Sequence, residues 1–137
     1  MRYKPKHAAS LLRLAQCKLL AGSRLSFRWS KVYIGSGSFL GIQEGGSIEI
    51  LNGDRVYIDR QTEISAVGGR VIIGGGTYFN RNVMLVSLCE IRIGIDVMIG
   101  PYTSIWDANH GSDPRLGSFR HQPYNLRKTE IHDNVWL

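Results

Sequence analysis

Apolar residues recur at every sixth position through the middle of the chain. The clearest series is Ile73, Phe79, Leu85 and Ile91, which resumes after a two-residue slip as Ile93, Ile99 and Ile105. A period of six fits neither an α-helix, with 3.6 residues per turn, nor an amphipathic strand, with a period of two. It fits short strands wound around a prism, each side contributing one inward aliphatic residue. The pattern therefore predicts an all-β fold, a parallel β-helix of hexapeptide repeats.

The corners of such a prism should be marked by small residues, because a bulky side chain would clash there. A glycine or a small polar residue often follows the apolar one, as in Ile73-Gly74 and Ile99-Gly100. The chain has 16 glycines in 137 residues, which suits many tight corners and disfavours a helical bundle. The six-residue period is interrupted at 45–54 and 68–69. These interruptions predict corner loops that bulge outward without changing the register of the core.

The length of 137 residues suits one domain with a modest core. We expect a basic helical segment at 1–31 and a β-helix domain at 32–137, with about four irregular coils. Residues 108–129 have no periodicity and contain two prolines, which predicts a long projecting loop. Loops of this length are usually functional. The residues after the loop begin a final coil that is incomplete.

The positive charge is concentrated in the N-terminal segment. Residues 1–31 contain eight Lys or Arg and no acidic residue, whereas the rest of the chain has nine basic and eleven acidic residues. Because the repeat body lacks a basic stripe, nucleic-acid binding is not expected. No apolar run approaches the roughly 20 residues needed to cross a bilayer. Cys17 and Cys89 lack CxxC spacing and a secretory signal, which favours reduced thiols in a cytoplasmic protein.

Residues 8–21 predict a short amphipathic helix that ends at Gly22. Its apolar face consists of Ala8, Leu11, Leu12, Ala15 and Leu19. The helix either caps the open end of the β-helix and covers its strand edges, or rests on an anionic membrane surface. Capping is favoured, since solenoids need their terminal core shielded. The membrane alternative would make the protein peripheral at the inner face of the membrane.

Chemistry on a β-helix is expected on its outer wall and loops, because the interior is filled. His110 lies where the repeat body gives way to the loop, preceded by Asp107 and Asn109. A neutral imidazole, with an ordinary pKa of about 6.5, can take a proton from an attacking hydroxyl. A single loop histidine is more often an ordinary surface residue. His110 therefore needs support from a wider pattern before it is assigned as a general base.

That wider pattern consists of the segments IGGGTYFNRNVMLV, IRIGIDVMIGPYTSI and DANHG, followed by a long loop and DNVW. Together they resemble the hexapeptide-repeat O-acetyltransferases, above all the sugar- and polysaccharide-acetylating branch with galactoside and maltose O-acetyltransferases. The resemblance covers roughly residues 55–137. It implies a left-handed β-helix and a cytoplasmic homotrimer with active sites between subunits. It also implies an acyltransferase that moves acetyl from acetyl-CoA to a hydroxyl of a sugar or surface polysaccharide.

The resemblance also assigns roles to individual residues. His110 matches the general base, Asn80 the residue that holds the acceptor sugar, and Trp136 a residue near the thioester end of acetyl-CoA. Tyr78 and Asp107 complete the predicted acceptor site. The structural alternatives are a corner role for Asn80, cover of the outer wall by Tyr78 and terminal packing of Trp136.

The sequence leaves two alternatives to an acetyltransferase, a zinc enzyme of the same fold and a non-catalytic protein. The same fold hosts zinc carbonic anhydrases, but His110, His121 and His132 are eleven positions apart, which gives no reason to expect convergence at about 2 Å from a metal. No metal is therefore expected. The family continues after Asn-Val-Trp with coils that bind acetyl-CoA, whereas this sequence ends at Leu137. The second hypothesis is accordingly a truncated, non-catalytic β-helical remnant.

Overall fold

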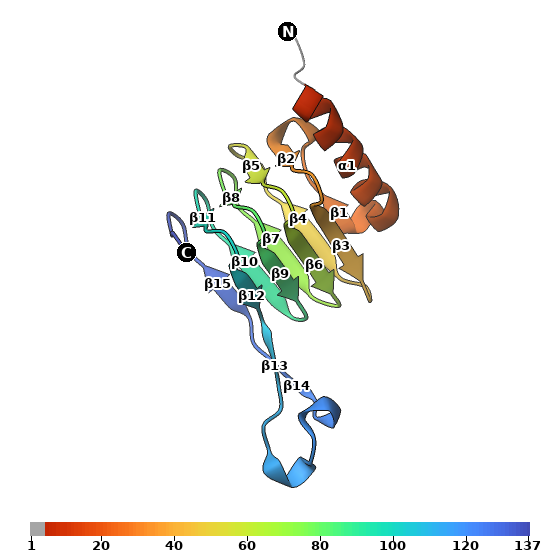
Figure 1. The fold of residues 1–137 in the computed structure, drawn as a ribbon, viewed down its shortest axis with the longest axis vertical. Coiled ribbons are helices and arrows are strands. Elements are labelled where there is room, and N and C mark those ends of the chain that lie inside the picture. Colours follow the sequence, from red (N-terminus) through yellow and green to blue (C-terminus); the bar gives the residue numbers. More distant parts are fainter. Residues whose placement is uncertain (1–4) are drawn as a thin grey trace.

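The computed structural model describes residues 5–137, which form a β-solenoid of about four turns with a helix at its N-terminal end (Figure 1). Three parallel sheets each take one strand from successive turns. Sheet 1 contains β1 (Leu25–Ser26), β4 (Ser47–Ile50), β7 (Arg70–Ile73), β10 (Glu90–Ile93) and β15 (Thr129–Ile131). Sheet 2 contains β2 (Val32–Ile34), β5 (Val56–Ile58), β8 (Tyr78–Phe79) and β11 (Met98–Ile99). Sheet 3 contains β3 (Phe39–Gln43), β6 (Glu63–Val67), β9 (Met84–Ser87) and β12 (Ser104–Trp106). The predicted parallel β-helix is confirmed.

The six-residue beat marks the side chains that fill the shaft of the solenoid. Every residue of the predicted series, from Ile73 to Ile105, is buried. The two-residue slip arises in sheet 1, where strands direct two alternate side chains inward. On β10 these are Ile91 and Ile93, which pair with Val71 and Ile73 on β7. The slip is therefore part of the coil and not a break in the repeat.

The predicted close approach at the corners is seen at Gly74. A Cβ atom at this position would lie 2.3 Å from the carbonyl oxygen of Gly94 in the next coil. Because both sides of the contact are backbone, neither can move aside. The predicted interruption at 45–54 is only partly a loop. Ser47–Ile50 form strand β4, and the additional residues lie beside it, since the register steps from Ile50 to Ile73 and then by a shorter interval from Ile73 to Ile93. The additional residues leave the buried positions aligned.

Helix α1 (Pro5–Ala21) begins earlier than predicted and ends before Gly22 as predicted. It covers the N-terminal end of the solenoid, but not with the predicted apolar face. The residues buried against the solenoid are Ser10, Leu14, Cys17 and Ala21. Leu12 and Leu19 of the predicted face are 69% and 85% exposed. The choice of face in the sequence-based prediction was wrong.

The physical reason is the hydrogen-bonding demand of the first coil. Its strands have no preceding coil, so backbone groups at their free edge need other partners. The Ser10 hydroxyl accepts a hydrogen bond from the backbone N–H of Ile34 at 2.9 Å. The Arg13 guanidinium donates to the carbonyl of the same residue at 3.3 Å. The Cys17 thiol, which is free, lies 3.5 Å from the backbone N–H of Leu40. Edge satisfaction, and not hydrophobicity alone, selects the packed face.

The 3₁₀ turn η1 (Gly22–Arg24) connects the helix to the first coil, and a second turn, η2 (Trp29–Lys31), lies within that coil between β1 and β2. That coil begins at β1, upstream of the boundary predicted at residue 32, because Leu25 pairs with Ile48 in sheet 1. Along residues 5–137, no helix combines the length and the apolar character needed to cross a membrane.

The predicted loop projects away from the solenoid (Figure 1). It contains an antiparallel ribbon of β13 (Ala108–His110) and β14 (Tyr124–Leu126) and the 3₁₀ turns η3 (Pro114–Leu116) and η4 (Phe119–His121). The chain leaves the solenoid after β12 and returns at β15. Ile91 pairs with Thr129, so sheet 1 continues across the insertion. The loop is therefore an ordered extension and not a structureless excursion.

Candidate functional site

Asp107 fixes the base of the loop to the corner that follows β9. Its carboxylate accepts hydrogen bonds from the Ser87 hydroxyl at 2.7 Å and from the backbone N–H groups of Leu88 at 2.7 Å and Cys89 at 3.0 Å. Its carbonyl accepts a hydrogen bond from the N–H of Arg127, on the returning strand of the loop, at 2.9 Å. The Asp107 side chain is buried. In this conformation Asp107 positions the loop and does not face solvent.

His110 lies at the end of β13 with its side chain exposed. It is the cross-strand partner of Tyr124, and the two rings lie 4.5 Å apart between centroids with 39° between their planes. Cross-strand neighbours of this kind restrict each other's side-chain rotation. The imidazole is therefore accessible to a ligand and supported on one side by an aromatic ring. This arrangement suits a base that acts on the outside of the solenoid.

The tip of the loop is held together by Gln122, which the sequence analysis did not identify. This side chain is buried, and its amide oxygen accepts a hydrogen bond from the N–H of Asp113 at 3.0 Å. Its amide nitrogen donates to the carbonyls of Asp113 at 3.0 Å and Gly117 at 2.9 Å. No periodic signal marks such a residue, because its partners are separated from it by an irregular segment. Gln122 gives the loop a small polar core of its own.

One ion pair lies at the tip of the loop and another at its returning end. Arg115 donates to Asp113 at 2.7 Å, and this contact lowers the pKa of the Asp113 carboxyl and raises the pKa of Arg115. Lys128 lies 2.9 Å from Glu90 on β10. The lysine lowers the pKa of the Glu90 carboxyl. Lys128 thus attaches the returning end of the loop to sheet 1.

Tyr78 and Trp136, two other predicted site residues, lie on one outward column of sheet 2. Tyr78 pairs with Met98, and Met98 forms a β-bridge with Trp136. Tyr33, Tyr57 and Tyr78 stack along this column, with centroid separations of 4.3 Å and 5.4 Å. Burial, followed by the Asp59 carboxylate, raises the pKa of Tyr78. Trp136 is 81% exposed and Met98 is 54% exposed, so this end of the column offers an apolar outer surface.

Asn80 lies at the corner that follows β8. Its side-chain oxygen accepts a hydrogen bond from the N–H of Arg81 at 2.8 Å, and its carbonyl accepts one from the Thr62 hydroxyl at 2.8 Å. The left-handed residue of this corner is Asn82, with φ of 57°, and not Asn80. Among residues 5–137, the side-chain nitrogen of Asn80 finds no hydrogen-bond acceptor. Asn80 thus shapes the corner and keeps a donor available.

The predicted residues therefore form two groups within one chain. Tyr78, Asn80 and Trp136 belong to sheet 2 and its corner, whereas Asp107 and His110 belong to the ribbon that leaves after sheet 3. The ribbon points away from the solenoid, and β8 lies on the solenoid itself (Figure 1). The two groups thus occupy different parts of the fold.

Within residues 5–137, no group of three His, Cys, Asp or Glu side chains is arranged to hold a metal ion. The described residues do offer an exposed imidazole, an amide donor and an apolar aromatic surface.

Two curated proteins of known name are similar to this chain. A galactoside O-acetyltransferase of Lactococcus lactis subsp. lactis (strain IL1403) is 36% identical over 85 residues, which cover 62% of the chain and 40% of that protein. A Dictyostelium discoideum protein named "Putative acetyltransferase" is 26% identical over 86 residues, which cover 62% of the chain and 43% of that protein. No protein-family model and no solved structure matches the chain.

The alignments thus span less than half the length of these curated relatives. Within the aligned part, the names of the relatives agree with the β-solenoid seen in the structure. Fold and sequence similarity together confirm the resemblance of this chain to the hexapeptide-repeat acetyltransferases.

Proposed function

We propose that the chain takes part in O-acetylation, in which an acetyl group passes from acetyl-CoA to a hydroxyl of a sugar or surface polysaccharide. The observation that carries this proposal is the exposed His110 imidazole on an ordered ribbon. The names of the two relatives support acetyl transfer in general, and one of them is named for a galactoside. The free thiols of Cys17 and Cys89 suit a reducing cytoplasm.

Acetyl-CoA supplies the activated acyl group, and the residues of this chain supply base and orientation. His110 removes the proton of the acceptor hydroxyl as its oxygen forms a bond to the acyl carbon, and the same imidazole returns that proton to the departing thiolate. Asn80 donates from its free side-chain nitrogen to the acceptor and fixes the approach of the hydroxyl. The exposed surface of Trp136 and Met98 fits an apolar thioester arm.

We further propose that these groups meet between subunits of a homotrimer. The ribbon extends beyond its own solenoid, which leaves His110 free to reach a neighbouring copy (Figure 1). The loop also presents Leu116 and Phe119, which are 60% and 62% exposed. Exposed apolar side chains at the tip of an ordered loop favour burial against another protein surface. In this arrangement His110 of one copy faces the Tyr78–Asn80 corner of the next.

The test is release of CoA from acetyl-CoA, followed with a thiol-reactive dye in the presence of a panel of sugars. His110→Ala should lower kcat by about 100- to 10,000-fold, the usual contribution of a general base, while binding of acetyl-CoA by calorimetry stays unchanged. His121→Ala is the matched control, since His121 is an exposed histidine in the same loop. A His110→Ala protein with full activity would remove His110 from the mechanism. Absence of both acetyl-CoA binding and turnover in the unmodified chain would favour the non-catalytic remnant.

A further inference from the structure

Helix α1 has an apolar face that the solenoid does not use. The residues packed on the solenoid lie at 10, 14, 17 and 21, and a second set with the same spacing begins two residues earlier. At 100° per residue this offset places the two sets on roughly opposite sides of the helix. The second set, which we name the outer stripe, consists of Ala8, Leu12, Ala15 and Leu19, all exposed.

The outer stripe is not needed for capping. At the free edge of the first coil, the N–H and C=O of Ile34 and the N–H of Leu40 already have partners on the other face of the helix. Leu14 is buried at the end of the shaft. Leu20, the neighbour of Leu19 in the chain, is 84% exposed as well, so the exposed leucines are not limited to Leu12 and Leu19. Contiguous exposed apolar surface of this kind marks an interaction site.

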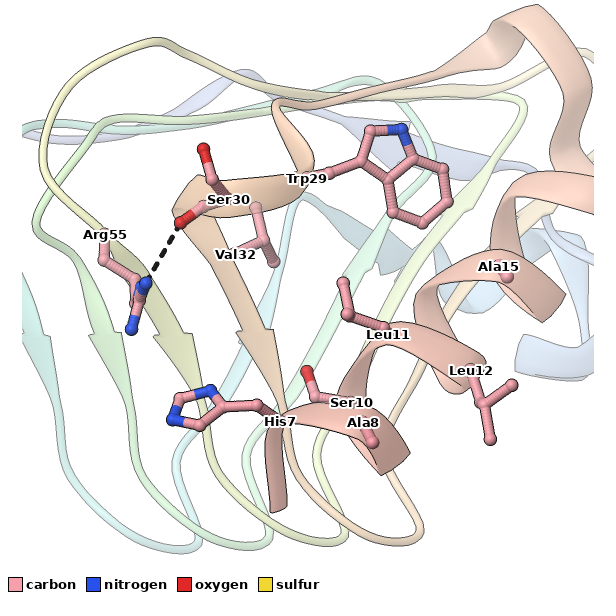
Figure 2. A pocket seen from close by; sticks show the side chains of 10 residues that line it. All are labelled: His7, Ala8, Ser10, Leu11, Leu12, Ala15, Trp29, Ser30, Val32 and Arg55. Carbon is pink, nitrogen blue, oxygen red and sulfur yellow. Dashed lines mark hydrogen bonds between the residues drawn. The ribbon is translucent and has the colours of Figure 1, made fainter. Parts of the chain in front are cut away.

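Trp29 extends the apolar surface beyond the helix. It stands on η2 and, with Leu11 and Ala15, lines an open groove of about 790 Å³ between the helix and the first coil (Figure 2). Its ring packs edge-on against Phe27, with centroids 4.9 Å apart, and remains 46% exposed. A tryptophan held in place with half its ring in solvent has the amphipathic character found at membrane–water interfaces.

Positive charge follows the helix in the chain. Arg24 and Arg28 are exposed between the helix and Trp29, and residues 1–31 contain no acidic residue. Among the residues that the structure describes, every salt bridge involves a cation from position 70 onward. The combination of an apolar stripe, an interfacial tryptophan and unpaired cations complements an anionic lipid surface.

We propose that the helical end of the solenoid docks on an anionic membrane, with the outer stripe and Trp29 in the boundary between headgroups and acyl chains. Arg24 and Arg28 contact the lipid phosphates. The helix lies at the extreme end of the solenoid, and its outer side faces away from the coils (Figure 1). A second copy is a poorer occupant, because it would bring the same positive charge against itself. Capping and membrane contact, alternatives in the sequence analysis, thus use opposite faces of one helix.

The test is co-flotation of the purified protein with phosphatidylcholine vesicles that contain or lack phosphatidylglycerol. We expect flotation with the anionic vesicles at low salt and its loss at high salt, because surface charges are screened. Leu12→Gln/Leu19→Gln should weaken binding by about tenfold or more, since two side chains no longer enter the lipid. Arg24→Gln/Arg28→Gln should also weaken it, since each cation near the surface contributes.

The matched control is Met84→Gln/Ile95→Gln, which removes two exposed apolar side chains away from the helix and should float like the unmodified protein. Circular dichroism verifies that each variant is folded. The proposal is overturned by absence of flotation, by equal flotation with neutral vesicles, or by full binding of the leucine variant. It is also overturned if the outer stripe instead mediates self-association, seen as a concentration-dependent mass that the leucine variant abolishes without any vesicle binding.

Discussion

The carboxylate of Asp107 accepts a hydrogen bond from the hydroxyl of Ser87, 2.7 Å away, and both side chains are buried. The two residues are twenty positions apart and belong to successive coils. Asp107 is also where the chain leaves the solenoid for the loop. This contact and the two backbone hydrogen bonds beside it hold the ribbon that carries His110 in a fixed position on the solenoid.

Replacement of Asp107 by Asn should therefore loosen the loop and destabilise the fold. Both carboxylate oxygens accept hydrogen bonds from donors, so an amide nitrogen in either position faces a backbone N–H. A buried unsatisfied donor costs about 1–3 kcal/mol. Urea denaturation should show this loss, and limited proteolysis should show faster cleavage within 108–128. The control is Asp54→Asn at an exposed position. Equal midpoints for the two variants would contradict the anchoring role.

Tyr124 should act as a positioning residue for His110. Loss of its ring in Tyr124→Ala frees the imidazole to rotate, and misplacement of a catalytic group of this kind lowers kcat by about tenfold to a hundredfold. The KM for acetyl-CoA should stay unchanged, because Tyr124 lies on the ribbon and not on the sheet 2 surface. Tyr124→Phe keeps the ring contact and should recover most of the rate. Equal kinetics for the Ala and Phe variants would show that the ring contact has no part in turnover.

Ser10→Ala should destabilise the capped end of the solenoid. The substitution leaves the buried N–H of Ile34 without its acceptor, which costs about 1–3 kcal/mol. The change is measured as a lower midpoint of chemical denaturation. Gln16→Ala, at an exposed position on the same helix, controls for changes in helix propensity and should leave the midpoint unchanged. Equal stability of the two variants would mean that the helix packs without satisfying the strand edge.

We expect the folded protein to lose stability in alkali, where Tyr57 ionises. Burial, followed by a hydrogen bond with Tyr33, raises the pKa of Tyr57 to about 12 from its ordinary value near 10. A pKa raised on folding means that its stabilising contribution is present in full below about pH 10 and is lost as the pH rises toward 12. Urea denaturation of the unmodified protein and Tyr57→Phe should give a constant difference below about pH 10 and a changing one above it. Tyr102→Phe, at a position 71% exposed, should show no such divergence.

The repeat fold could be predicted from the sequence because one residue in six is both apolar and buried. Ile73 and Phe79 carry that signal without reference to any distant residue. The packed face of helix α1 could not, since hydrophobic periodicity selects Leu12 and ignores the backbone groups that Ser10 satisfies. Gln122 was missed for the same reason, because its partners are fixed only by the folded loop.

The roles of the candidate site residues, and their expected arrangement between subunits, came from the resemblance alone and stay predictions. His110 is exposed and Asn80 keeps a free donor, as their proposed roles require. Asp107 instead faces the solenoid, because a buried corner offers it three donors that solvent would otherwise have to match. Sequence spacing alone could not separate a carboxylate that contacts a ligand from one that supports the residue that does.

The ribbon is inserted between β12 and β15, and Thr129 of β15 still pairs with Ile91 of the preceding coil. The loop can therefore be exchanged as a unit. Its length and chemistry can diversify while the scaffold keeps its alignment, because the entry and exit points sit on the same corner. A different loop could then be grafted at this corner without redesigning a single strand of the solenoid.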